Sequence, residues 1–276
     1  MALHRHAKTA AVAVVAAAGI ATTAGTGAFA AASPEAADSA KPTVVLVHGA
    51  FADSSSWNNV IKILQQRGYP VVAPANPLRG LPGDSAYLTS VLRSIHGPIV
   101  LVGHSYGGEV ITNAAESDPD VKALVYAAAI APAKGESAND ILGAYPGSKL
   151  PDALNPVPYP KPDGTTATDL YIKPDKFREA FAGDVPASTA AVMAATQRPV
   201  DAASLADKSE AEAWKTIPSW YLVTAHDEAI PPAAQRFMAK RAGAHTAEVN
   251  SAHDVAVSHP ADVAHLIIDA ANATVR

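Results

Sequence analysis

Three residues of this 276-residue sequence have the types and the order needed for nucleophilic catalysis: Ser105, Asp227 and His253. A serine hydroxyl attacks poorly unless a base takes its proton and a carboxylate orients that base. Each of the three follows an apolar run that is typical of a buried β-strand. We therefore expect acyl transfer through a covalent serine intermediate, provided that the fold brings the three side chains together.

The serine stands at the centre of the stretch GHSYG (103–107), which fits the pattern Gly-x-Ser-x-Gly. An apolar run at 98–102 precedes this stretch, and a helix-like run at 109–115 follows it. Between a strand and a helix, such glycines permit a tight, strained turn that exposes the hydroxyl of the central serine. The N-terminus of the following helix would favour negative charge that develops at that point, so Ser105 is the candidate nucleophile.

The candidate acid and base also follow predicted strands. Asp227 comes just after the apolar run at 219–225, and His253 lies in the loop after the run at 245–249. Catalytic groups of open parallel sheets collect at the carboxyl ends of the strands. Both residues are therefore expected at the same edge of the sheet as Ser105.

Neighbouring acids and histidines offer alternative interpretations. Glu228 and Asp254 are rival acids, although Asp254 is adjacent to His253, and adjacent side chains rarely orient each other in this way. Asp84 and Asp140 fall in predicted loops without a motif. Four further histidines are interpreted as packing, hydrogen-bonding, capping or solvated residues: His48, His104, His226 and His259.

No cofactor or metal is expected. A metal site can be imagined from Asp227, His253 and two neighbouring histidines, His226 and His259, but these residues lack a compact ligand signature. The chemistry outlined above requires only protein groups.

Six apolar runs predict the strands that must position these residues: 43–47, 70–73, 98–102, 121–129, 219–225 and 245–249. Runs that are apolar on both faces are typical of parallel strands covered on both sides. Helix-length segments separate most of them, and in the first of these Val60, Ile63 and Leu64 share one helical face before Gly68. The expected fold class is therefore α/β, with a doubly wound, mostly parallel sheet.

The alternation of strands and helices stops over about 131–215, which we interpret as an inserted cap made of helices and loops. The segment 144–166 is dense in proline and glycine and predicts turns or loop, whereas 169–183 and 186–199 predict short helices. A long insertion between two strands of a compact sheet is usually functional. We expect it to act as a lid over the strand ends.

The N-terminus predicts export. MALHRHAK is followed by an alanine-rich apolar stretch and by AFA at 28–30, so we interpret 1–30 as a secretory signal peptide, 31–42 as a leader and 43–276 as the folded α/β domain. Removal of Arg5 and Lys8 with the signal changes the formal net charge from −5 to −7. We expect an acidic extracellular protein without nucleic-acid partners or stable membrane association; its oligomeric state is not predicted.

Four motifs together resemble those of the α/β-hydrolase superfamily: VLVHGAF at 45–51, LVGHSYGG at 101–108, YLVTAHDEAIP at 221–231 and SAHDVAVSHP at 251–260. The similarity is greatest to small serine esterases, in the branch that also contains plant methylesterases and hydroxynitrile lyases. It covers about 43–130 and 217–271, and it implies the α/β-hydrolase fold.

The resemblance also implies a role for each matched residue. Ser105 would be the nucleophile, His253 the general base and acid, and Asp227 the carboxylate that orients the histidine. The HGAF turn resembles the segment that forms the oxyanion hole, with the backbone N–H of Ala50 and that of Tyr106 as its donors. Two aromatic residues are weaker candidates for a substrate pocket: Phe51 and Tyr145.

The predicted function is a secreted serine esterase that cleaves small to medium carboxylic esters, a carboxylesterase-like enzyme with a small-molecule ester as substrate. One alternative is a hydroxynitrile lyase on the same triad. Those relatives carry threonine and lysine where this sequence has Gly49 and Asp254, and both differences favour the esterase. The other alternative is a non-catalytic ligand-binding protein on the same scaffold, because a fold does not fix a function.

Overall fold

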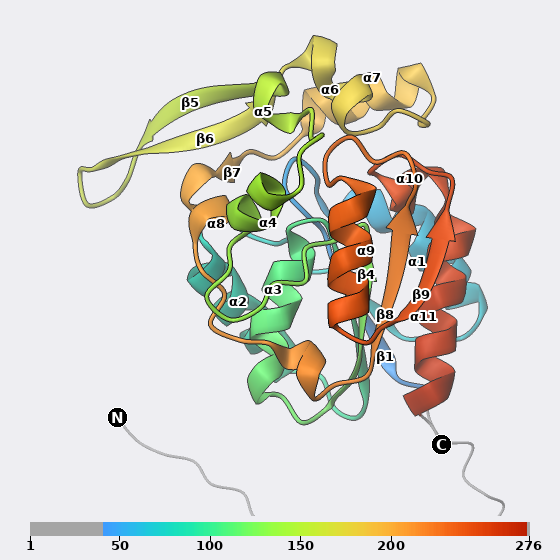
Figure 1. Ribbon diagram of the computed structural model, residues 1–276. Coiled ribbons are helices and arrows are strands. Elements are labelled where there is room, and N and C mark those ends of the chain that lie inside the picture. The colour runs from blue at the N-terminus through green and yellow to red at the C-terminus, as the bar shows by residue number, and fades with distance from the viewer. Residues whose placement is uncertain (1–40, 275–276) are drawn as a thin grey trace, which may run out of the picture. The chain divides into compact units, whose positions relative to one another are not determined.

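A six-stranded parallel sheet forms the centre of the computed structural model, which describes residues 41–274 (Figure 1). In spatial order its strands are β2 (Val71–Val72), β1 (Thr43–Val47), β3 (Ile99–His104), β4 (Val121–Ala127), β8 (Ser219–Thr224) and β9 (His245–Val249). Each predicted strand is present within two residues of its expected ends. The predicted signal peptide, and the leader up to residue 40, lie outside the described residues.

Helices cover both faces of this sheet. One face carries η1 (Ser54–Trp57), α1 (Asn58–Gln66), α10 (Val255–Ser258) and α11 (Pro260–Thr274). The other face carries α2 (Leu81–Leu92), α3 (Gly107–Ala114), η2 (Ala115–Ser117) and α9 (Pro232–Arg241). A cluster of buried side chains lies on each face of the sheet. Within β1, Val44 and Leu46 belong to the cluster under α1 and α11, whereas Val45 and Val47 belong to the cluster under α2, α3 and α9. This alternation confirms for β1 the prediction of strands that are buried on both sides, whereas β9, at the edge of the sheet, is mostly exposed and does not fit it.

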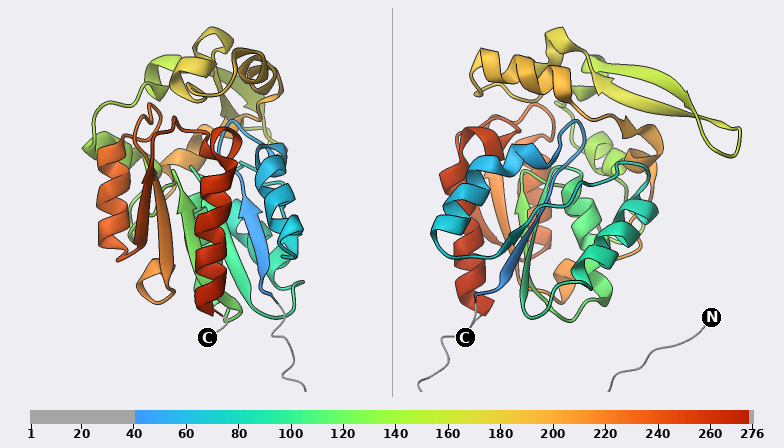
Figure 2. Two further views of the ribbon diagram at one scale, coloured as in Figure 1. Left: turned by 90° about the vertical axis from the view of Figure 1, so that its right-hand side faces the viewer. Right: turned by 180° about the vertical axis from the view of Figure 1, so that it is seen from behind.

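A long insertion between β4 and β8 lies across the carboxyl ends of the central strands (Figures 1 and 2). It consists of α4 (Ala138–Ala144), α5 (Leu150–Ala153), β5 (Leu154–Pro160), β6 (Thr166–Ile172), α6 (Pro174–Ala180), α7 (Ala187–Thr196), β7 (Val200–Asp201), α8 (Ala202–Ala206) and η3 (Ala213–Lys215). We refer to residues 131–215 as the cap.

The prediction for the first half of the cap was wrong in part. The segment expected to be loop contains α5 and β5, and the first four residues of the expected helix at 169–183 belong to β6. β5 and β6 pair as an antiparallel hairpin, and β7 joins β6 as a third strand. Prolines usually argue against a strand, but β5 is an edge strand, where missing N–H groups at Pro156, Pro158 and Pro160 are tolerated.

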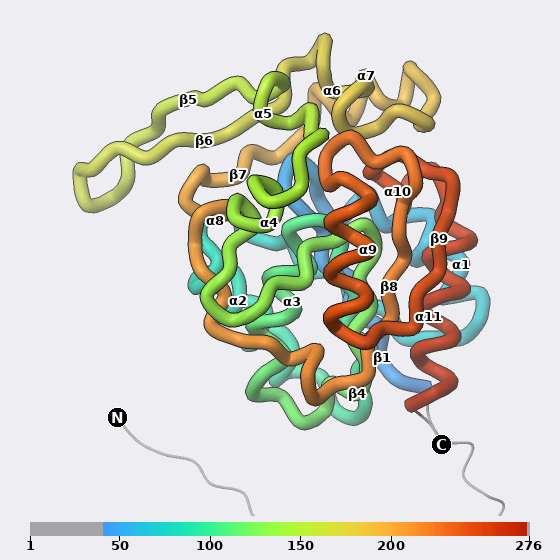
Figure 3. The backbone as a smooth tube through the Cα atoms, in the orientation of Figure 1, coloured from blue at the N-terminus to red at the C-terminus, as the bar shows by residue number. Residues whose placement is uncertain are grey.

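The cap brings α6 and α7 over the loop that joins β9 to α10 (Figure 3). The contact is direct, because the N–H of Asp254 in that loop donates a hydrogen bond of 3.1 Å to the carbonyl oxygen of Phe181, just after α6. The strand ends, the loops that follow them and the inner side of the cap thus meet in one region. None of the helices within 41–274 is both long and apolar enough to span a membrane.

Candidate active site

Ser105 occupies a sharp turn between β3 and α3. Its φ angle of 53° lies in the left-handed region, which is uncommon for a residue with a side chain. The flanking glycines leave no room for side chains, because a Cβ on Gly103 would approach the carbonyl oxygen of Gly107 to 2.6 Å, and one on Gly107 would approach that of Val47 to 2.5 Å. The turn therefore holds the serine in a strained conformation at the carboxyl end of β3.

Backbone hydrogen bonds fix this turn to the elements around it. The carbonyl oxygen of Ser105 accepts hydrogen bonds of 3.0 Å from the N–H of Gly108, in α3, and from the N–H of Ile130, after β4. These two bonds tie the serine to the helix that follows it and to the neighbouring strand.

The side chains of His253 and Asp227 form a buried pair. The Nδ1 atom of His253 lies 2.8 Å from Oδ2 of Asp227, and both side chains are at most 1% exposed. The Nε2 atom of His253 has no hydrogen-bond partner among the described residues. Next to Ser105 in the chain, His104 lies against this pair, with its ring 4.8 Å from that of His253. The three sequence-predicted residues are thus brought to one region, with the serine–histidine hydrogen bond not formed in this structure.

Four hydrogen bonds besides that of His253 hold the Asp227 carboxylate. Its Oδ1 atom accepts the N–H groups of Ala229 and Ile230, and its Oδ2 atom accepts from Thr224 Oγ1 and Gln235 Nε2, all at 2.8 Å. Thr224 ends β8 and Gln235 lies on α9, so two elements orient the acid. Neither residue was singled out from the sequence, since Thr224 lies in the motif at 221–231 without a role assigned to it and Gln235 lies outside the four motifs.

The electrostatics of the pair favour a charged carboxylate. Burial by itself acts to raise the pKa of Asp227, but the ring of His253 and the hydrogen bonds that the carboxylate accepts outweigh it. The pKa of Asp227 therefore lies below its ordinary value, and the carboxylate can stabilise a protonated histidine.

The rival residues make other contacts. Glu228 lies 3.4 Å from the ammonium of Lys149, and His226 is exposed, as expected for a loop histidine. The carboxyl oxygens of Asp254 have no hydrogen-bond partner among the described residues. Within 41–274, no group of three or more histidine, aspartate and glutamate side chains is arranged to hold a metal ion.

His48 and His104 are buried and neutral. His48 accepts the N–H of Asn76 at Nε2 (3.0 Å), so Nδ1 carries the proton and donates to the carbonyl oxygen of Gly49 (2.9 Å). His104 donates from Nε2 to the carbonyl oxygen of His253 (3.0 Å). Burial lowers the pKa of His48 to about 4 and that of His104 to about 3. Both act as hydrogen-bonding residues that position the turns around the serine.

The HGAF turn after β1 lies against the serine. A Cβ on Gly49 would come within 2.5 Å of the Cβ of Ser105 and within 3.2 Å of its Oγ. The backbone N–H groups of Ala50 and Tyr106 donate no hydrogen bond to another residue of the described chain. These two groups are thus free to donate to an oxygen atom that carries negative charge beside Ser105.

The side chain of Tyr106 is anchored below the turn. Its hydroxyl donates a hydrogen bond of 2.8 Å to Oδ2 of Asp84, whose Oδ1 accepts the N–H of Arg79 at 3.0 Å. Burial raises the pKa of Asp84, although these hydrogen bonds partly offset the effect. Asp84 lies in α2 and not in a loop, so the prediction that placed it in a loop was wrong. It fixes the residue that carries one candidate oxyanion donor.

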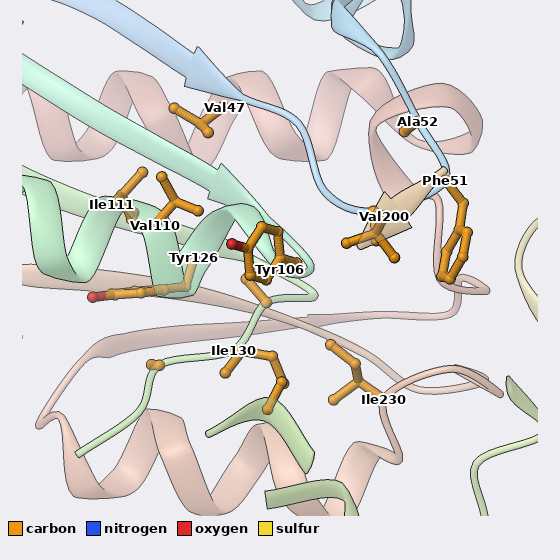
Figure 4. Close-up of a cluster of buried hydrophobic side chains, with 14 of the residues drawn as sticks. Val47, Phe51, Ala52, Tyr106, Val110, Ile111, Tyr126, Ile130, Val200 and Ile230 are labelled. Carbon is orange, nitrogen blue, oxygen red and sulfur yellow. The ribbon is translucent and has the colours of Figure 1, made fainter. Parts of the chain in front are cut away.

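An aromatic layer from the cap covers the site. The ring of Phe181 lies 4.9 Å from that of His253 and 6.2 Å from those of His104 and Phe51. Phe51, a predicted pocket residue, belongs to the cluster of buried side chains in Figure 4, which also includes Tyr106. With this cover in place, Ser105 is only 8% exposed.

The other predicted pocket residue, Tyr145, packs against the edge of the same buried cluster. Tyr145 follows α4, and its ring packs at 5.4 Å from Phe237, an exposed residue of α9. Its aromatic partner is therefore a surface residue and not a member of the site. Phe181 occupies the position over the histidine, and nothing in the local sequence distinguishes it from other cap residues.

Known proteins resemble this chain over most of its length. The family described as the alpha/beta hydrolase family matches residues 44–266. A pyrethroid hydrolase from Sphingobium wenxiniae is 30% identical over 258 residues, which cover 83% of this chain and 88% of that protein. Methylesterase 1 from Arabidopsis thaliana is 25% identical over 219 residues, covering 72% and 83%.

Solved structures also resemble this chain in their fold. The crystal structure of polyneuridine aldehyde esterase matches with a TM-score of 0.72 at 20% identity, covering 83% of this chain and 98% of that one. The resemblance and the fold class predicted from the four sequence motifs are confirmed.

Proposed function

The chain belongs to the α/β hydrolase family and is a carboxylesterase-like enzyme, and from this premise we propose that it is a secreted serine esterase for small to medium carboxylic esters. The observation that carries the proposal is the buried hydrogen bond of 2.8 Å between His253 and Asp227, next to a serine held at a φ angle of 53°. Relatives named as a pyrethroid hydrolase and as methylesterases support the choice of esters.

In the proposed mechanism, the Oγ atom of Ser105 attacks the ester carbonyl carbon while Nε2 of His253 takes the hydroxyl proton. The carbonyl oxygen becomes an oxyanion that the N–H groups of Ala50 and Tyr106 bind. The intermediate then collapses, the C–O bond to the alcohol breaks, and His253 protonates the departing oxygen. Water repeats these steps on the acyl-enzyme, and Asp227 stabilises the imidazolium each time. Removal of one oxyanion donor typically costs about 3 kcal/mol of transition-state stabilisation.

The space around Gly49 and the charge of Asp254 both disfavour the alternative of a hydroxynitrile lyase. Those relatives carry threonine at the position of Gly49, where even a Cβ would meet the Cβ of Ser105 at 2.5 Å. They carry lysine at the position of Asp254, and a carboxylate there would repel a departing cyanide ion. Cyanide release from mandelonitrile by the purified protein would contradict this part of the proposal.

The esterase proposal is tested with p-nitrophenyl esters from acetate to palmitate. Wild type is expected to hydrolyse them with an optimum at short or medium acyl chains, and Ser105→Ala is expected to lose turnover while it remains folded. Ser219→Ala serves as the control, because that buried hydroxyl bonds only to the carbonyl oxygen of Ile217 and is expected to retain activity. Turnover by Ser105→Ala at the wild-type rate would contradict the mechanism.

Export and the lid form the rest of the proposal. The charged start and the alanine-rich run of residues 1–30 support export with cleavage of a signal peptide. N-terminal sequencing of the protein recovered from culture medium tests this, and an intact Met1 there would contradict cleavage. The contact of Phe181 with His253 supports the role of residues 131–215 as a lid, since this ring of the cap packs directly on the proposed catalytic base.

A further inference from the structure

The loop that joins β9 to α10 carries His253 and is held from two sides. At the strand ends, the carbonyl oxygen of Ser251 accepts a hydrogen bond of 3.0 Å from the N–H of His226. The carbonyl oxygen of His253 accepts one of 3.0 Å from Nε2 of His104. Both bonds go to carbonyl oxygens of the loop, so the N–H groups on either side of the histidine are left to other partners.

The cap supplies acceptors for those two N–H groups. The Oδ2 atom of Asp184, between α6 and α7, accepts the N–H of Ala252 at 3.0 Å. The carbonyl oxygen of Phe181, in the same short segment of the cap, accepts the N–H of Asp254 at 3.1 Å. The cap thus binds the residue before the histidine and the residue after it.

Asp184 makes a second hydrogen bond to the loop. The same Oδ2 atom accepts the hydroxyl of Ser251, a buried residue, at 2.9 Å. The Oγ atom of Ser251 lies 3.0 Å from that of Ser258, which in turn lies 3.0 Å from Nδ1 of His259. That nitrogen is 3.4 Å from Oδ2 of Asp184. The carboxylate therefore belongs to a network that ties the cap to both ends of α10.

The N–H of Ala252 depends on this carboxylate. Among residues 41–274 it has no other hydrogen-bond acceptor, and Ala252 is only 9% exposed. Gly183 packs on the same residue, since a Cβ on Gly183 would lie 3.4 Å from the Cβ of Ala252. Buried N–H groups are almost always paired, and hydrogen bonds to a charged acceptor are roughly twice as strong as neutral ones. Asp184 thus determines where this part of the loop lies.

The position of the loop sets the position of the proposed base. The hydrogen bond of 2.8 Å to Asp227 fixes the imidazole ring of His253 at Nδ1, while the backbone that carries the ring is held by the contacts described above. Proton transfer requires Nε2 to come within hydrogen-bond distance of the Ser105 hydroxyl. A misplacement of about 1 Å in an active site can cost roughly 100-fold in rate, so a loosened loop has a large effect.

We propose that Asp184 is a positioning residue: from the cap, it holds the loop of His253 where Nε2 can take the proton of Ser105. The inference rests on the proposed esterase function and adds to it a dependence of the base on the cap. Asp184 and Phe181 lie in one short segment, so a cap that moves away withdraws both together. The base is fully held only while the cap covers the site.

Asp184→Ala tests this assignment with p-nitrophenyl butyrate. We expect kcat to fall about tenfold, because the loop loses two hydrogen bonds and the base is correctly placed for less of the time. Acylation and deacylation both use the base, so KM should stay within about twofold of wild type. Asp184→Asn keeps an oxygen that can accept both bonds and should retain kcat within about threefold, which separates hydrogen bonding from charge.

Asp163→Ala is the matched control. This carboxylate also belongs to the cap and also accepts one N–H and one hydroxyl on a single oxygen, both from Thr165, at the end of the β5–β6 hairpin (Figure 1). Its removal should leave kcat unchanged. Amide hydrogen exchange over 250–254 gives a readout that is independent of activity. The exchange should accelerate in Asp184→Ala and remain as in wild type in Asp163→Ala.

Ser251→Ala removes one of the two bonds from the side of the loop. We expect kcat to fall about threefold at an unchanged KM, because the bond from Ala252 to Asp184 remains. In the double variant, kcat should equal that of Asp184→Ala alone, since the hydroxyl of Ser251 then has no carboxylate to lose. Ser251→Ala keeps the proposal testable if Asp184→Ala does not fold.

Three results would overturn the inference: an unchanged kcat in Asp184→Ala beside an active wild type, an equal fall in Asp163→Ala, or a loss in Asp184→Asn as large as that in Asp184→Ala. Failure of the esterase function is distinguishable, because wild type itself would then hydrolyse none of the esters. In that case hydrogen exchange decides. Faster exchange over 250–254 in Asp184→Ala would support the hold of the cap on the loop, and unaltered exchange would refute it.

Discussion

Gly49 and Ser105 lie closer together than any side chain at position 49 would permit. The ideal Cβ position on Gly49 is 2.5 Å from the Cβ of Ser105 and 2.8 Å from the carbonyl oxygen of His104. Backbone would have to move to admit even one methyl group, and the turn that would move also carries the N–H of Ala50. The distance between the proposed nucleophile and the proposed oxyanion donor is thus set by a residue without a side chain.

We predict that Gly49→Ala lowers kcat/KM for p-nitrophenyl butyrate by about 100-fold, because displacements near 1 Å in an active site have effects of that size. The control is Gly83→Ala in α2, where an added Cβ meets no atom within 4 Å, and which should keep full activity. Steady-state kinetics, with circular dichroism to check folding, provides the measurement. Near-normal activity of Gly49→Ala would mean that this turn does not form the oxyanion hole.

Among individual residues, those that directly follow a strand could be predicted from the sequence. Those whose role depends on contacts between separate elements could not. Ser105, Asp227 and His253 could be picked out because strand ends meet at one edge of a parallel sheet. Phe181, Asp84 and other residues around the site could not, since contacts between separate elements determine their roles. Tyr145 was selected for its type and position in the cap, and its ring packs against Phe237 of α9.

At the scale of elements, the cap is joined to the site through Arg79. Its guanidinium pairs with Asp169 of β6 and lies over the ring of Tyr159 of β5 at 5.1 Å, while its N–H binds Asp84. Asp84 in turn binds the hydroxyl of Tyr106. A chain of direct contacts thus runs from the β5–β6 hairpin to the turn that carries Ser105.

Arg79→Met is expected to loosen the hairpin with little change in global stability. Ion pairs that are partly exposed contribute about 0–1 kcal/mol, and the Arg79 side chain is 43% exposed. Amide hydrogen exchange over β6 should therefore accelerate while the unfolding midpoint shifts little. Arg236→Met, which removes the exposed pair with Glu248, is the matched control and should leave β6 unchanged. Unaltered exchange over β6 in Arg79→Met would show that the pair does not hold the cap.

Some helices and strands, like some site residues, could be predicted from the sequence, and others could not. Five of the six central strands are marked by β-branched, apolar runs, and β9 (HTAEV) is a mostly exposed edge strand. All six were predicted within two residues of their ends. The cap hairpin was not predicted, because the prolines of β5 conceal a strand that depends on its pairing with β6. Pairing between segments of a sheet is a tertiary property, and local composition carries little information about it.

At the scale of the whole molecule, buried ionisable groups make stability depend on pH in opposite directions. His48 and His104 are neutral in the folded state, with pKa values lowered to about 4 and about 3. Because the unfolded chain takes up protons at these residues below about pH 6.5, the free energy of unfolding decreases as the pH falls below that value. Asp254 has its pKa raised to about 7, so the folded protein holds a proton that the unfolded chain releases. Its contribution therefore becomes less favourable as the pH rises from about 4 to about 7.

Asp254→Asn isolates this last contribution. The amide does not ionise, so the variant should gain stability relative to wild type as the pH is raised from about 4.5 to about 8, by about 3 kcal/mol. Urea unfolding at the two pH values measures the difference. In the exposed control Asp140→Asn, the stability difference from wild type should be nearly the same at both pH values, because a hydrogen bond from Lys208 lowers the pKa of Asp140 to about 2 and its contribution is lost only below about pH 4. A pH-independent difference for Asp254→Asn would mean that Asp254 is ionised in the folded protein at low pH.

The central claim is that Ser105 is the nucleophile, and covalent labelling tests it most directly. A fluorophosphonate reacts only with an activated serine and leaves a stable tetrahedral adduct that resembles the proposed intermediate. Mass spectrometry of the digested protein is expected to find one adduct, on Ser105 in wild type, and none in Ser105→Ala or His253→Ala. An adduct on another residue, or an unlabelled protein that still hydrolyses p-nitrophenyl esters, would contradict the account.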